Sequence, residues 1–230
     1  MEGIYSPTAY WSAARNCYVG RVEPQPEPGY YAWEGHTDGA IYYCFTLPIT
    51  STGIFEFWAA QPPVAALPPS PEELARQAIA MMGLKAIDIG IVPEPNPNSM
   101  GFVGLPTWMW TLPTPETWGP IVRSASGGGV TVTATAHVKT VAWSMGDGTT
   151  VSCGSPGTPY QDAFGKRDSP TCGHTYTRTS VGKPSDAYPV AATSYWAIDW
   201  AGGGESGTIT VDFVAETQVR IGELQVLVTG

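Results

Sequence analysis

Trp143-Ser144-Met145-Gly146-Asp147-Gly148 is the stretch that decides the fold, because in it an apolar strand runs directly into a tight turn. Trp143 ends the strand on the face that would fill a core. Gly146 and Gly148 permit positive φ, and the carboxylate of Asp147 can bond the backbone of its own turn. Asp-Gly between apolar runs is a hairpin signal. We therefore expect a structural role for Asp147, with calcium binding or acid–base chemistry as the alternatives.

The sequence around this turn is β-rich. His174-Thr175-Tyr176 and Tyr188-Pro189-Val190 follow it along the chain. Alternating apolar and polar residues predict several strands in this part of the chain, with Gly-rich turns between them. Such a succession of strands and turns is typical of a β-sandwich. The predicted strands cover residues 130–136, 138–144, 188–198, 207–214 and 219–228.

These motifs, in this order, resemble the PKD family, the polycystic-kidney-disease repeat, which has an immunoglobulin-like β-sandwich fold. The resemblance covers residues 125–230 and is carried by Trp143, Gly146, Asp147, Gly148, His174, Tyr176 and Tyr188. The chain departs from the family in having Met145 where Phe is usual, an insertion at 151–171, and the longer segment 181–187 before the Tyr-x-Val strand. The resemblance implies a module that makes protein–protein or protein–carbohydrate contacts.

The sequence of the first half of the chain predicts short strands and a proline-rich connector in place of a sandwich. Residues 1–60 are rich in aromatic residues and predict short strands at 41–46 and 54–58. Residues 61–124 predict a proline-rich connector with one helix at about 71–82, with Ser70 as its N-cap and an apolar stripe that packs on a sheet. A short strand at 105–110 follows the helix. The fold class we expect is mainly β: a C-terminal immunoglobulin-like sandwich, an N-terminal β-rich region and one short helix.

The four cysteines predict two disulfides. Cys17, Cys44, Cys153 and Cys172 form no Cys-x-x-Cys pair, which disfavours a zinc site. Three pairings are possible, and we prefer Cys17–Cys44 with Cys153–Cys172 because each pair then stays inside one expected domain. Four buried thiols in a cytosolic protein are the alternative. Disulfides indicate secretion or a cell-surface location. No signal peptide is visible in the sequence, so we expect an exported chain to have lost its leader.

Composition excludes several classes of function. The net charge is −9, and the Lys and Arg residues are scattered, so we expect no nucleic-acid partner. No apolar run is long enough for a membrane span. The three histidines, His36, His137 and His174, lack metal-ligand spacing, and neither a nucleophile elbow nor a phosphate loop is present. We expect no enzymatic activity, no cofactor and no metal.

The aromatic residues are the candidates for ligand binding. The chain has nine tryptophans and eleven tyrosines, more than two small cores require. An exposed platform for sugars or a protein could include Trp108, Trp110, Tyr195, Trp196 and Trp200; the alternative is that they fill the core. We predict a non-enzymatic adhesion or scaffold module. The alternatives are a self-assembling subunit of a surface fibre and an accessory binding part of a secreted carbohydrate-active or proteolytic enzyme. The cysteine-bracketed insertion and the Pro- and Trp-rich first half resemble secreted proteins of actinobacteria.

Overall fold

The computed structural model describes residues 9–46, 53–65 and 67–224. The fold is mainly β, as the sequence predicts, with several antiparallel sheets and one α-helix. By internal contacts the chain divides into two compact units. The first, here called the N-terminal unit, comprises Met1–Met81, Arg123–Ala134 and Trp200–Gly207. The second, here called the sandwich unit, comprises Met82–Val122, Thr135–Asp199 and Thr208–Gly230.

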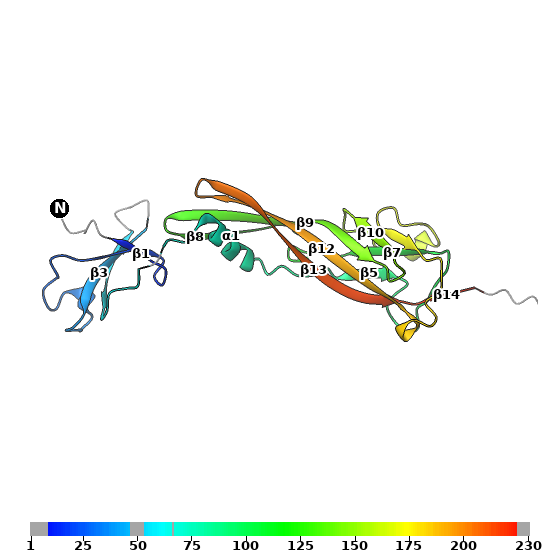
Figure 1. The fold of residues 1–230 in the computed structure, drawn as a ribbon, viewed down its shortest axis with the longest axis horizontal. Helices are drawn as coiled ribbons and strands as arrows, with labels where there is room; N and C mark the ends of the chain where they lie inside the picture. The colour runs from blue at the N-terminus through cyan, green and yellow to red at the C-terminus, as the bar shows by residue number, and fades with distance from the viewer. Residues whose placement is uncertain (1–8, 47–52, 66, 225–230) are drawn as a thin grey trace, which may run out of the picture. The chain divides into compact units, whose positions relative to one another are not determined.

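Four strands form an antiparallel sheet in the N-terminal unit (Figure 1), in the order β1 (Tyr10–Ser12), β2 (Cys17–Arg21), β3 (Ala40–Phe45) and β4 (Ile54–Ala59). The inner strands β2 and β3 are buried on both faces of the sheet. One face carries the Cys17–Cys44 disulfide, packed with Val19 and Tyr42. The other packs Ile41 and Tyr43 against the loop between β2 and β3. Strands with apolar residues on both faces explain the aromatic-rich, weakly alternating sequence of this region.

Helix α1 (Pro71–Ala80) begins where the sequence predicts. The Ser70 side chain accepts from the Glu73 N–H, and the Glu73 carboxylate accepts from the Ser70 N–H, which forms a complete capping box. Leu74, Ala75 and Ala78 are buried, as the predicted stripe requires. Leu74 lies beside Gly127 of β8 (Ile121–Gly127), so the helix packs on a strand.

The sandwich strands are longer than predicted. A five-stranded sheet has the order β10 (Thr150–Cys153), β9 (Val130–Ser144), β12 (Tyr188–Gly202), β13 (Glu205–Val219), and β8 also pairs with β9. The two strands predicted at 130–136 and 138–144 are one continuous strand. In β9 the buried side chains change from even to odd positions between Val138 and Val141, but the strand continues through this change.

The expected connector also supplies strands. β5 (Ile89–Val92) and β7 (Pro106–Thr111) form a second antiparallel sheet with β11 (Gly173–Thr175). β6 (Gly101–Phe102) pairs in parallel with β14 (Ile221–Gly222). The strand predicted at 219–228 is therefore too long: Val219 ends β13, residues 223–224 are not in a strand, and residues 225–228 lie outside the described residues. Residues 82–122 therefore belong to the sandwich unit and do not merely lead into it. In the described ranges the other helical segments are the 3-10 turns η1 (Tyr31–Trp33), η2 (Asp162–Phe164) and η3 (Pro184–Asp186).

Candidate binding site

The motif residues that decide the fold converge around the turn after β9. Asp147 Oδ1 accepts from the Thr149 N–H at 2.9 Å, and Asp147 Oδ2 lies 2.8 Å from His174 Nε2. The Tyr176 hydroxyl donates to the carbonyl of Met145 at 2.9 Å, and its ring stacks on Tyr188 with centroids 4.6 Å apart. Both carboxylate oxygens of Asp147 therefore take part in interactions that stabilise the turn, and the side chain of Trp143 is buried in the core.

Electrostatics agree with a structural role for this cluster. Burial on its own would raise the pKa of Asp147, but the hydrogen bonds from Thr149 and the interaction with His174 outweigh it and lower that pKa below its usual value. Burial, reinforced by the negative charge of Asp147, raises the pKa of Tyr176. A firmly ionised carboxylate and a firmly protonated phenol stabilise this turn, and neither is poised to exchange protons near neutral pH.

The predicted aromatic platform is wrong for three of its members. Trp196, Trp108 and Trp200 are 1%, 2% and 8% exposed, so they belong to the core. Trp110 is half-buried and lies over Gly90 of the neighbouring strand β5. Tyr195 on β12 is 45% exposed and alone remains an open surface aromatic of this group.

The insertion explains why Trp108 is covered. The disulfide between Cys153 and Cys172 brackets it, and its Phe164 ring stacks on Trp108 at 5.0 Å between centroids. Tyr160 contacts the same indole edge-on, and Trp108 Nε1 donates to the carbonyl of Arg167 at 2.8 Å. Period-two alternation puts Trp108 and Trp110 on one face, but it does not reveal that a distant loop folds over that face.

An exposed aromatic cluster lies instead in the loop between β2 and β3 of the N-terminal unit. Tyr30 and Tyr31 are 38% and 68% exposed, with ring centroids 4.5 Å apart. Their hydroxyls both donate to Glu56 Oε2 on strand β4, at 2.7 and 3.1 Å. The shared bond to Glu56 is the first cause of a raised pKa for Tyr30, so this phenol stays protonated as a donor.

A cavity of about 340 Å³ opens in this loop. It is lined by Pro28, Gly29, Tyr30, Tyr31, Trp33, Glu34, Gly35, His36 and Thr37, and we call this surface the aromatic loop site. The 3-10 turn η1 shapes it and ends at Glu34 and Gly35, which have φ of 48° and 86°. Because all of the lining comes from one short segment, the site is complete within the N-terminal unit.

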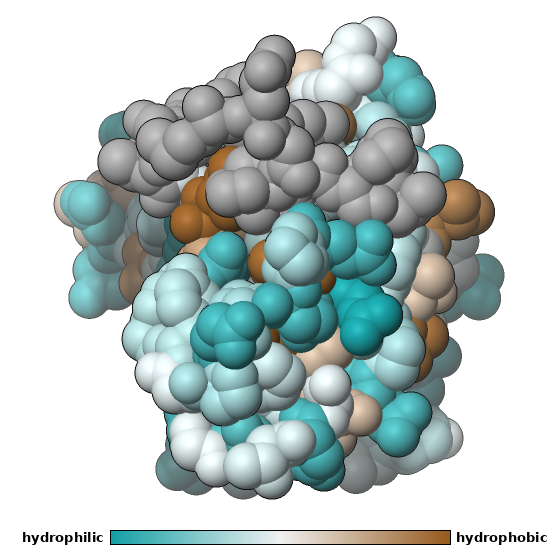
Figure 2. Space-filling model, turned by 90° about the vertical axis from the view of Figure 1, so that its left-hand side faces the viewer, coloured by the Kyte–Doolittle hydropathy of each residue, from teal (hydrophilic) through white to brown (hydrophobic). Residues whose placement is uncertain are grey.

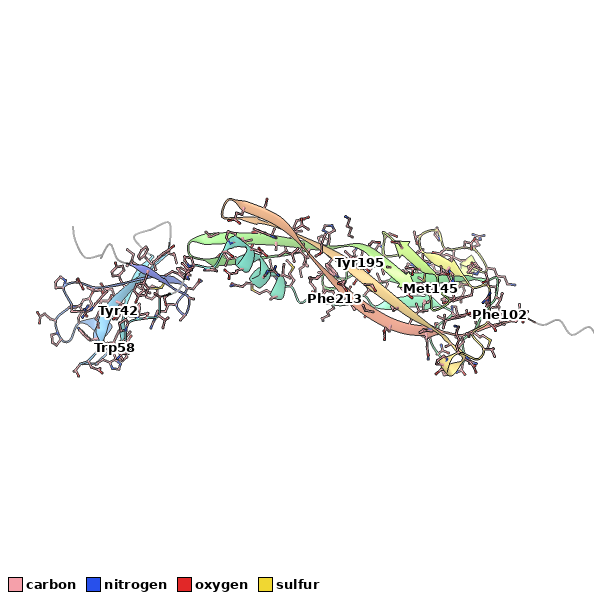
Figure 3. All side chains as sticks on the ribbon, in the orientation of Figure 1. Tyr42, Trp58, Phe102, Met145, Tyr195 and Phe213 are labelled. Carbon is pink, nitrogen blue, oxygen red and sulfur yellow. A yellow bond between two sulfur atoms is a disulfide. The ribbon has the colours of Figure 1, made fainter. Side chains whose placement is uncertain are left out.

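The aromatic loop site is fixed to the sheet beneath it. Trp33 Nε1 donates to the carbonyl of Pro26 at 3.1 Å. The His36 ring lies parallel to Trp58 of β4 with centroids 3.5 Å apart, and Trp58 Nε1 donates to the carbonyl of Asp38. Figure 3 labels Trp58 within this sheet. Anchored aromatic rings lose little conformational entropy on binding, which is the property of a preformed site.

The charge around the site has one sign. No Lys or Arg occurs between Arg21 and Arg76, whereas Glu27, Glu34 and Asp38 are exposed in the loop. In the space-filling view the side with β3 faces the reader, and its described residues are mostly teal or white (Figure 2), which reflects polar and aromatic residues more than aliphatic ones. Such a surface repels anions and suits neutral or cationic ligands that present both apolar faces and hydroxyl or amino groups.

The sequence places His36 in a loop but does not single out this site. The run Tyr30-Tyr31-Ala32-Trp33, directly after the proline-rich segment 23–29, is the signal that could have found it, because three aromatics in a loop lack a strand to pack in. Glu56, the partner of Tyr30 and Tyr31, lies 26 and 25 residues further on, beyond the reach of local patterns.

No family model matches the chain, and neither curated proteins nor solved structures give a match. No helix in the described ranges is long and apolar enough to cross a membrane. Across the same ranges, the acidic, histidine and cysteine side chains form no group of three or more that could hold a metal ion. The disulfides Cys17–Cys44 and Cys153–Cys172 are as predicted, and they point to an oxidising environment.

Proposed function

We propose that this chain is a non-enzymatic module of the cell surface or secreted space, with a PKD-like sandwich, and that its N-terminal unit binds carbohydrate. The observation that carries the proposal is the aromatic loop site: adjacent, exposed Tyr30 and Tyr31 held rigidly by one carboxylate over a cavity. Sugar rings offer apolar C–H faces that stack on aromatic rings, and their hydroxyls bond to the polar groups around them.

The negative charge around the aromatic loop site favours neutral or cationic sugars over acidic ones. With acidic residues at its rim and no Lys or Arg in residues 22–75, the aromatic loop site disfavours uronic acids and phosphorylated glycans. Neutral or amino sugars fit better, because a hydroxyl or an amino group can donate to Glu34 or Glu56. The two disulfides and the low content of charged residues, 13%, agree with an exported protein.

Titration with soluble oligosaccharides tests this proposal. Chitohexaose, cellohexaose and a glucosamine oligomer represent neutral and cationic ligands, and an oligogalacturonate represents acidic ones. We expect binding within the first group, and Tyr31→Ala should weaken it about tenfold or more, the loss expected for truncating an exposed aromatic anchor.

Phe55→Ala is the matched control. Phe55 is also an exposed aromatic, at 55%, but it alternates with Glu56 along β4 and so points to the opposite face of the sheet. Its removal should leave sugar binding unchanged. Equal losses in the two variants, or binding restricted to oligogalacturonate, would count against the aromatic loop site.

A further inference from the structure

Strand β13 is a long open edge of the five-stranded sheet. It has fifteen residues, and β12 is its one neighbour among the strands of the described ranges. The opposite edge of that sheet is formed by two shorter strands, β10 with four residues and β8 with seven. An edge strand presents a row of backbone N–H and C=O groups that another strand can pair with.

The β13 edge lacks two of the features by which proteins protect edges, lysine and proline. Residues 205–219 contain neither Lys nor Pro. No side chain in the strand is fully buried before Val219. Ile209, Val211 and Phe213 form a half-buried apolar row at alternate positions; Figure 3 labels Phe213 on this strand and Tyr195 on β12. An added strand with apolar residues at alternate positions would extend that row and bury it further.

The other face of the same edge is acidic. Residues 187–219 contain no Lys, Arg or His, and Asp212 and Glu216 are exposed on β13. Thr208 Oγ1 donates to Asp199 of β12 at 2.6 Å, which puts Asp199 on that face as well, since Thr208, Asp212 and Glu216 alternate in step. Asp212 and Glu216 lie four residues apart, roughly 13 Å along the strand.

We propose that the β13 edge binds an extended, cationic segment of another protein as an additional strand. Backbone pairing supplies the affinity, and the apolar row contacts alternate side chains of the segment. Lys or Arg at two positions four residues apart faces Asp212 and Glu216, which sets the register. A second copy of β13 is the poorer occupant, because it presents carboxylates of its own to the same acidic face.

Peptide binding to the whole chain tests the proposal. The first probe is a fluorescent peptide that alternates Thr and Val, with Lys replacing two Thr residues four positions apart; the second has Glu in place of Lys. A third peptide keeps the lysines but carries N-methyl groups on the backbone nitrogens of one edge, which removes the N–H donors that strand pairing needs. We expect the first peptide to bind, with an affinity that falls as salt rises, and the other two to bind at least tenfold more weakly.

Charge reversal locates the site. The double variant Asp212→Lys, Glu216→Lys should lose at least tenfold in affinity for the Lys peptide and gain binding to the Glu peptide. Asp162→Lys with Asp168→Lys makes the same change in net charge at exposed positions of the insertion and should leave affinity unchanged. Tyr31→Ala should also have no effect, so this test and the sugar test fail independently. Circular dichroism and non-reducing mass spectrometry check that each variant is folded.

Three results would overturn the proposal. Equal affinity for the Lys and Glu peptides would show that Asp212 and Glu216 do not select the ligand. Undiminished binding of the N-methylated peptide would show that the peptide does not bind as an added strand. The third result is self-association of the unmodified chain that rises with protein concentration. If the double variant Asp212→Lys, Glu216→Lys changed this self-association, the partner at the β13 edge would be a second copy of the chain.

Discussion

At the scale of single residues, Asp147 shows how the motif works. A short polar side chain in a turn can be a catalytic acid, a metal ligand or a turn brace, and the sequence alone leaves these open. The distances decide, since Asp147 bonds Thr149 with one oxygen and His174 with the other. The identity of Asp147 as a turn residue was predictable from its flanking glycines. Its His174 partner is 27 positions away, beyond the reach of local sequence patterns.

Replacing Asp147 with Asn should lower the free energy of unfolding at pH 7 by about 1.5–3 kcal/mol, the range for hydrogen bonds to charged groups. The lowered folded-state pKa means that the unfolded chain binds the proton more tightly, so this stabilisation is complete above the unfolded pKa and is lost as pH falls through the folded pKa.

Urea unfolding at several pH values measures this effect. The unmodified chain should lose stability below about pH 4 more steeply than Asp147→Asn, because that window lies at and below the ordinary pKa of Asp. Parallel pH profiles for the two proteins would contradict the assignment. Asp162→Asn, at an exposed position of the 3-10 turn η2, should reproduce the unmodified profile.

At the scale of elements, the turn after β9 contains two glycines that differ in one respect. Gly146 and Gly148 both have positive φ, 73° and 96°. A Cβ on Gly148 would meet open space, whereas a Cβ on Gly146 would clash with the carbonyl of Pro189 on β12. Positive φ was predictable from the Gly-Asp-Gly pattern, but the contact with Pro189 depends on tertiary packing.

Alanine substitution at each of these two glycines gives a controlled comparison. Gly148→Ala should destabilise the fold by about 1–2 kcal/mol, the cost of left-handed backbone for a residue with a Cβ. Gly146→Ala has the same backbone cost plus the clash with Pro189, so its loss of unfolding free energy should be clearly larger. Thermal or urea unfolding gives the comparison, and equal losses would show that β12 does not press on the turn.

The insertion is a second element with a testable role. Its disulfide closes a loop with a sequence separation of 19, and Phe164 and Tyr160 hold it over Trp108. Lys166 and Arg167 are exposed trypsin sites within it. The sequence predicted the disulfide because this cysteine pair stays inside one expected domain, but it did not predict that the insertion would cover a tryptophan assigned to a binding platform.

Removing the bridge with Cys153→Ser and Cys172→Ser should cost about 3 kcal/mol in the chain-entropy model and speed trypsin cleavage after Lys166 and Arg167. Mass spectrometry of timed digests identifies the cut sites. Cys17→Ser with Cys44→Ser, which opens a bridge in the N-terminal unit, should not raise cleavage at these two sites. An unchanged rate in the first variant would mean that aromatic packing alone holds the insertion.

At the scale of the whole molecule, the sequence predicted the fold class better than the functional surface. Alternation, turn residues and cysteine spacing are local signals, and they led to the mainly β fold, the capped helix and both disulfides. Which aromatic residues are exposed depends on which distant segments cover them. Trp108 and Trp196 are therefore buried in the core. Tyr30 and Tyr31 are exposed, and their hydroxyls donate to Glu56, which is distant in the sequence.

Hydrogen–deuterium exchange with and without a saturating neutral oligosaccharide tests the central claim most directly, because it locates the ligand on the unmodified chain. Our account predicts slower exchange in peptides spanning residues 22–39 and in β4 around Glu56, with no change in β9, β12 or β13. Protection confined to the sandwich unit, with the loop between β2 and β3 unaffected, would contradict it.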